Sequence, residues 1–134
     1  MSYNTLSTYF NKVKNLSVKE VVCFNTEGNI FENACALRMS YALNKSGYTI
    51  KSSDGHVSSG MVDIESYLKK TFGVPKKGKT TSDFKESGII VFKVTNFSNA
   101  TGHVDLYNGK TVEGKDYCND SDWNVSKVLL FPLK

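Results

Sequence analysis

Residues 88–95 read GIIVFKVT, an apolar and β-branched run that predicts a buried strand. A second strand is expected over residues 102–107, GHVDLY, because polar and apolar side chains alternate there. It runs into Asn108-Gly109, the strongest short signal for a hairpin, and a return arm should follow through residues 111–113. With a last strand over residues 127–133, this half of the chain predicts an antiparallel sheet.

The first half of the chain predicts helices. Residues 3–13 and 62–72 carry apolar side chains at helical spacing. Residues 33–44 read NACALRMSYALN and are rich in strong helix formers. Asn33 is suited to cap the start of this helix, and Gly47 to end it.

The order of these elements predicts the fold class. Helices followed by antiparallel strands indicate an α+β fold, with the N-terminal helices packed on the sheet. Between the two halves, the lysine-rich residues 76–79 are expected to form a solvated loop. The chain is short enough for one domain, residues 1–134.

Charge, hydropathy and cysteine count argue against several classes of protein. Lys and Arg number 17 against 13 Asp and Glu, and Arg38 is the only Arg, so no nucleic-acid partner is expected. No apolar run approaches the roughly 18 residues of a membrane span, so no membrane insertion is expected. The N-terminus lacks the pattern of a signal peptide, which predicts production in the cytoplasm. Three Cys without a CxxC motif predict neither a disulfide scaffold nor a metal site, and no cofactor is expected.

Cys35 is the candidate nucleophile, because it falls in the first turn of the helix predicted over residues 33–44. The partial positive charge of a helix N-terminus stabilises a thiolate, and the unpaired N–H groups there can donate to an oxyanion. The alternative is a small buried residue that only fills space.

A thiol nucleophile needs a base that is held by a third group. His103 is the better base of the two His, because it opens a strand, whereas His56 lies in a polar, flexible stretch. The third group is expected to be Asp116, which the hairpin could bring opposite His103. Asp105 is the competitor, disfavoured because side chains two apart on a strand run in parallel.

The blocks NACALRMSYALN (33–44) and GHVDLYNG (102–109) together resemble the family-four amidase effectors of type VI secretion. These are small peptidoglycan amidases with a papain-like, NlpC-type fold. The resemblance implies that Cys35 is the nucleophile, His103 the base and Asp116 the third catalytic residue. It also implies cleavage of the γ-D-glutamyl to meso-diaminopimelate bond of stem peptides, through a thioester. Tyr107 departs from the pattern, because Trp is more usual there.

The same resemblance implies the partners and the place of action. They are a peptidoglycan stem peptide as substrate, the secretion apparatus, and a cognate immunity protein that plugs the site. The chain would be delivered to the periplasm of a target bacterium. Family members often pair a Cys just after the third catalytic residue with a neighbouring one, but Cys118 has no such neighbour, so it either pairs with Cys23 or stays free.

Arg38 and Trp123 are candidate substrate-binding residues. Arg38 lies three residues after Cys35 and could hold a substrate carboxylate or close a salt bridge, and Trp123 could line a groove or belong to the core. Two other functions stay open: a non-catalytic cell-wall-binding module in which Cys35 is only packed, and a transferase that uses the same residues.

Overall fold

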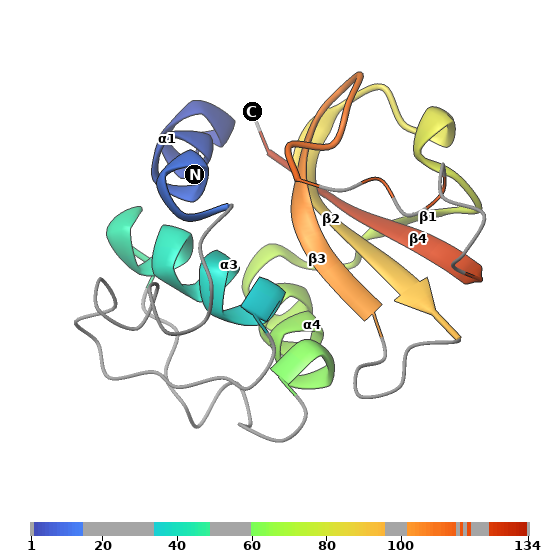
Figure 1. Ribbon diagram of the computed structural model, residues 1–134, viewed down its shortest axis with the longest axis horizontal. Helices are drawn as coiled ribbons and strands as arrows, with labels where there is room; N and C mark the ends of the chain where they lie inside the picture. The colour runs from blue at the N-terminus through green and yellow to red at the C-terminus, as the bar shows by residue number, and fades with distance from the viewer. Residues whose placement is uncertain are drawn as a thin grey trace.

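A computed structural model describes residues 2–14, 34–48, 60–95, 102–114, 116, 118 and 124–133. Its sheet has four antiparallel strands in the order β1-β4-β2-β3. The strands are β1 (Lys76–Gly78), β2 (Ser87–Val94), β3 (Gly102–Asn108) and β4 (Val125–Pro132). The predicted strands are therefore confirmed, and β3 lies at one edge of the sheet (Figure 1).

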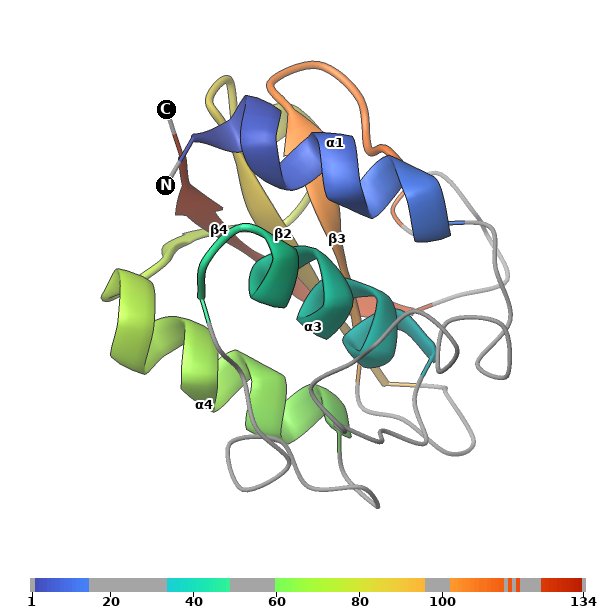
Figure 2. The same ribbon diagram turned by 90° about the vertical axis from the view of Figure 1, so that its left-hand side faces the viewer.

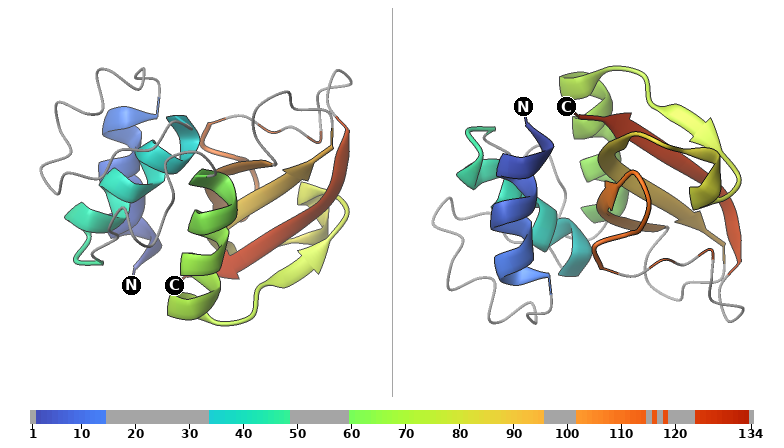
Figure 3. Two further views of the ribbon diagram at one scale, coloured as in Figure 1. Left: turned by 90° about the horizontal axis from the view of Figure 1, so that it is seen from below. Right: turned by 90° about the horizontal axis from the view of Figure 1, so that it is seen from above.

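Three helices gather on one face of the sheet (Figures 2 and 3). They are α1 (Tyr3–Val13), α3 (Ala34–Lys45) and α4 (Gly60–Phe72), and a short 3-10 turn, η2 (Thr81–Asp83), follows β1. The first helix has the predicted bounds, and α4 begins two residues before the predicted start. The cap predicted at Asn33 lies outside the described residues.

The loop predicted over residues 76–79 is wrong in part. Lys76–Gly78 forms β1, which pairs antiparallel with β4, Lys76 opposite Leu130. Three residues are too few to display the alternation that marks a strand in sequence, and lysines are common on edge strands because they deter pairing with another chain. The predicted solvation of this segment is confirmed, since Lys76, Lys77 and Lys79 are exposed.

Gly47 ends α3, as the sequence predicts. Its φ of 94° lies in the left-handed region that favours glycine. The N–H of Gly47 donates to the carbonyl of Asn44 (3.2 Å), and that of Tyr48 to the carbonyl of Leu43 (2.9 Å). These two bonds are the Schellman arrangement, which satisfies carbonyls at the helix end and fixes where the chain turns.

The sheet separates two hydrophobic cores. The larger core lies under the helices and contains Val104 and Leu106 of β3, while Tyr107 belongs to the core on the other face. The predicted alternation along β3 is thus confirmed. Because β3 is both an edge strand and a contact of α3, its first residues are where a helix end and a strand can bring functional groups together.

Candidate active site

Cys35 lies in the first turn of α3, which begins at Ala34. That position is the one the sequence predicts, and it gives a thiol the field and the unpaired N–H groups of a helix N-terminus. Helix α3 packs against β3, and its N-terminal end lies beside the start of β3 (Figures 1 and 2). The side chain of Cys35 is outside the described residues, so its role as nucleophile stays a prediction.

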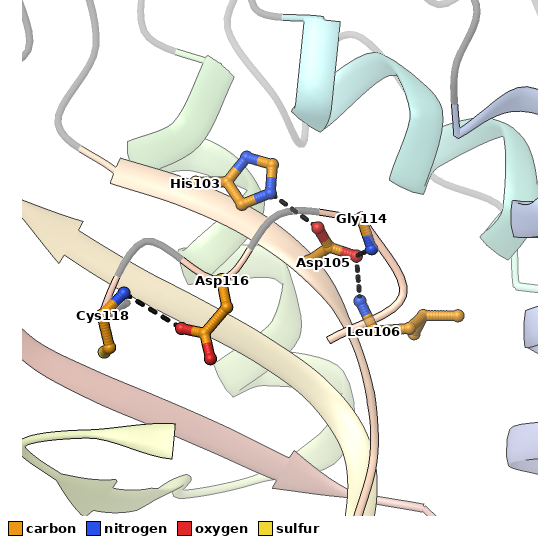
Figure 4. A network of polar contacts seen from close by, with 6 residues as sticks. All are labelled: His103, Asp105, Leu106, Gly114, Asp116 and Cys118. Atoms are coloured by element: carbon orange, nitrogen blue, oxygen red, sulfur yellow. Dashed lines mark hydrogen bonds and ion pairs between the residues drawn. The ribbon is translucent and has the colours of Figure 1, made fainter. Parts of the chain in front are cut away.

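His103 is the second residue of β3 and is held on two sides. Its ring stacks on Phe92, the residue opposite it on β2, with centroids 6.1 Å apart and planes 29° apart. Its Nε2 lies 2.7 Å from Oδ2 of Asp105 (Figure 4). Only 12% of the His103 side chain is exposed, so the imidazole has a defined direction, as a catalytic base requires.

Asp105 is 1% exposed and its carboxylate is the centre of a small network. Oδ1 accepts the backbone N–H of Leu106 (2.8 Å) and that of Gly114 (2.9 Å), while Oδ2 faces His103. Although side chains two apart on a strand run in parallel, the imidazole of His103 reaches along the strand to the carboxylate of Asp105, so the reason for disfavouring Asp105 does not hold for this pair. The structure therefore brings His103 and Asp105 together.

Asp116 faces another part of the molecule. Its Oδ2 accepts the hydroxyl of Thr81 at 2.9 Å, and its Oδ1 accepts the backbone N–H of Cys118 at 3.0 Å. In Figure 4 its carboxylate turns toward Cys118, whereas His103 turns toward Asp105. The role of Asp116 as third catalytic residue stays a prediction.

The hairpin after β3 begins in the predicted register. Tyr107 bridges Val112, and the N–H of Glu113 donates to the carbonyl of Leu106 (2.8 Å), so the predicted return arm begins as expected. Continued, that register would set residue 116 opposite residue 103. The N–H of Gly114, the residue opposite Asp105 in that register, donates to the side chain of Asp105.

Three further residues near this site had no sequence signal. Gly114 and Thr81 contribute a backbone N–H and a buried hydroxyl, which no motif marks. Tyr3 of α1 is buried close to Asp105: burial and the carboxylates of Glu113 and Asp105 hold the pKa of its hydroxyl well above the ordinary value.

The other predicted residues are placed only in part. Arg38 lies on α3 with a half-buried side chain, and Trp123, His56 and Cys23 lie outside the described residues. Cys118 is a free, half-buried thiol; burial and the charge of Asp116 raise its pKa. Within the described ranges, no group of three His, Cys, Asp or Glu could hold a metal ion, and no helix is long and apolar enough to span a membrane.

Residues 31–131 match the model of a protein family described as type VI secretion system (T6SS), amidase effector protein 4, or Tae4. The chain belongs to the Tae4 family. It is therefore an antibacterial amidase effector of type VI secretion, as the sequence resemblance predicts.

Solved Tae4 structures share its fold over the whole chain. Tae4 from Salmonella typhimurium, in complex with the immunity protein Tai4 from Enterobacter cloacae, is 32% identical with a TM-score of 0.82, covering 99% of both chains. Tae4 from Salmonella Typhimurium in its Tae4-Tai4 complex is 28% identical, with a TM-score of 0.82 over 99% of this chain and 98% of that one.

Tae4 from Enterobacter cloacae is 26% identical, with a TM-score of 0.80 over 99% of this chain and 96% of that one. These matches confirm the predicted α+β, papain-like fold. A search of curated proteins gave no match.

Proposed function

We propose that this Tae4 family member is a cysteine amidase that cleaves the γ-D-glutamyl to meso-diaminopimelate bond of peptidoglycan stem peptides. The observation that carries the proposal is the His103–Asp105 pair, with Nε2 and Oδ2 2.7 Å apart, at the edge strand on which α3 packs. Cys35 occupies the first turn of that helix. A nucleophile at a helix start and an oriented imidazole on a strand are the two parts that thiol acyl transfer needs.

The reaction follows from these parts. His103 takes the proton of the Cys35 thiol, and the sulfur attacks the carbonyl carbon of the scissile amide. As the C–N bond breaks, His103 gives the proton to the amine of diaminopimelate and a thioester remains on Cys35. Water then loses a proton to His103 and attacks the thioester, which releases the glutamyl carboxylate and returns the proton to the thiol. N–H groups at the start of α3 stabilise the oxyanion formed in each step.

The other residues proposed for the site are predictions from the sequence. Asp116 is the third catalytic residue that the family resemblance implies, and it is part of this proposal as a hypothesis separate from the Cys35–His103 pair. Arg38 is proposed to bind a carboxylate of the stem peptide, since it lies one turn beyond Cys35 on α3. Trp123 is proposed to line the substrate groove.

The proposed partners also follow the family. Related Tae4 proteins have been crystallised with Tai4 immunity proteins. We extend this to a cognate immunity protein that blocks the site of this chain in the producing cell. Delivery by the secretion apparatus would bring the chain to the periplasm of a target bacterium, where its substrate lies.

Digestion of diaminopimelate-type sacculi tests the proposal. Purified wild type should yield muropeptides cut between D-glutamate and diaminopimelate, with one new amine and one new carboxyl group per cut, read by mass spectrometry. Cys35→Ala should yield none, whereas Cys118→Ala, the matched loss of a thiol, should digest like wild type. Digestion by Cys35→Ala would overturn the mechanism, and binding to sacculi without any cut by wild type would favour the wall-binding module.

A further inference from the structure

Asp105 is a buried aspartate that the sequence ranks behind Asp116 as the group that holds His103. We propose that Asp105 is a positioning residue: it fixes the direction and tautomer of His103, so that Nδ1 is the nitrogen that exchanges protons with the nucleophile. This inference rests on the proposed function, because it assigns a role within the same site.

Two backbone donors hold the carboxylate of Asp105 in one orientation. Leu106 and Gly114 each donate a backbone N–H to Oδ1, at 2.8 and 2.9 Å, and the residue is 1% exposed. One of the two donors lies on β3 and the other on the return arm, so both sides of the hairpin hold the same oxygen. A carboxylate fixed in this way presents Oδ2 in one direction, toward His103.

The contact with Asp105 also decides which nitrogen of His103 carries the hydrogen. A carboxylate that already accepts two N–H groups is an acceptor, so the contact at 2.7 Å requires a hydrogen on Nε2. In the neutral imidazole the lone pair then lies on Nδ1, which becomes the basic nitrogen. A 180° flip of the ring would keep its stacking on Phe92 but would take Nε2 away from Asp105, so the contact at 2.7 Å fixes which nitrogen faces the carboxylate.

The backbone of Gly114 lies too close to Asp105 to leave room for a side chain. A Cβ built there would overlap Oδ2 of Asp105, the oxygen that contacts His103. The backbone of Gly114 is not in the left-handed region, so its conformation does not call for glycine. The close approach of this backbone to the carboxylate of Asp105 is what requires glycine at this position. The same approach joins the return arm to the His103 network.

Asp105→Asn is the variant that separates position from fold. The amide oxygen of Asn can still accept the N–H groups of Leu106 and Gly114, but its NH₂ then faces Nε2 and cannot accept a hydrogen from it. His103 should therefore change tautomer or turn away. We expect kcat for sacculus digestion to fall by about 10²- to 10⁴-fold, with little change in KM. Asp83→Asn is the matched control, since Asp83 is an exposed carboxylate on η2 that accepts backbone N–H groups.

A spectroscopic measurement reports the tautomer directly. The chain has only two His, so ¹⁵N-histidine labelling with a His56→Gln variant assigns the signals of His103. Wild type should show hydrogen on Nε2 and a basic Nδ1, and Asp105→Asn should show the reverse or a mixture. A residue with only a structural role would leave this pattern unchanged.

The outcomes of the two proposals can be told apart. If Asp105→Asn keeps the wild-type kcat and tautomer while Cys35→Ala is inactive, the positioning role is overturned and the proposed function stands. If Cys35→Ala is active as well, the proposed function itself fails. Loss of activity with an unchanged tautomer in a folded Asp105→Asn protein would also overturn the inference.

Discussion

Two aspartates stand near the end of the same hairpin, and their surroundings differ in kind. Asp105 is buried on β3, accepts two backbone N–H groups and faces His103. Asp116 is half-buried beyond the return arm, and two of its contacts go to the hydroxyl of Thr81 and the N–H of Cys118. The first carboxylate is joined to the imidazole, and the second ties a loop to the 3-10 turn.

The backbone register of the hairpin after β3 bears on both aspartates. Up to Glu113 the arm keeps the register of a hairpin, which would lead Asp116 to His103. At Gly114, opposite Asp105 in that register, the N–H donates to the side chain of Asp105. This hydrogen bond helps to hold Asp105 beside His103, whereas Asp116 accepts the hydroxyl of Thr81.

The largest expected difference is in stability. Asp105→Ala leaves the N–H groups of Leu106 and Gly114 and the imidazole of His103 without this acceptor, so we expect the free energy of unfolding to fall by about 3–5 kcal/mol. Asp116→Ala removes contacts of a half-buried group, and about 1 kcal/mol should be lost. Urea unfolding of both variants measures this, and equal losses would contradict the distinction between the two networks.

Gly114→Ala should give the next largest effect. Its Cβ would displace Oδ2 of Asp105, and we expect a loss of about 1–3 kcal/mol together with a fall in sacculus digestion. Gly47→Ala is the matched control: its φ of 94° makes Ala strained, but no atom lies within 4 Å of the added Cβ. It should lose about 1 kcal/mol and digest normally. Full activity in Gly114→Ala would show that the carboxylate need not stay where it is.

Much of the fold could be predicted because its signals are local. The alternation in GHVDLY separates the two faces of β3, and the glycine at position 47 ends α3 with the expected backbone conformation. Strand β1 was missed for the opposite reason: Lys76–Gly78 is a strand only because β4 lies beside it. The sequence of Lys76–Gly78 has no pattern that predicts its pairing with β4.

Only those parts of the candidate site that follow from side-chain patterns could be predicted from the sequence. Cys35 at a helix start and His103 on a strand follow from helix and strand patterns. The carboxylate of Asp105 that contacts His103 also accepts the backbone N–H of Gly114. Sequence patterns do not show where a backbone N–H points, so this contact could not be predicted. The hairpin register predicted from the sequence is confirmed up to Glu113, and the role of Asp116 stays a prediction.

Thr81→Val tests the contacts of Asp116 and should have a smaller effect on stability than the variants above. Val has the shape of Thr but lacks the hydroxyl that Asp116 accepts at 2.9 Å, and Thr81 is buried. The loss should be about 1 kcal/mol in urea unfolding. If Asp116 serves only to tie the loop to η2, digestion stays at the wild-type rate; a large loss of digestion would instead place this second network in the active site.

The smallest effect concerns the thiol beside Asp116. Burial, and then the negative charge of Asp116, raise the pKa of Cys118, so little thiolate exists at pH 7 and iodoacetamide should react slowly. Asp116→Asn removes a charge that disfavours the thiolate, so the pKa should fall and alkylation at pH 7 should become a few-fold faster. The measurement uses a Cys23→Ala, Cys35→Ala background, in which Cys118 is the last of the three Cys. Slower alkylation in Asp116→Asn would mean that Asp116 opens access to the sulfur, and the two aspartates would then differ less than their contacts indicate.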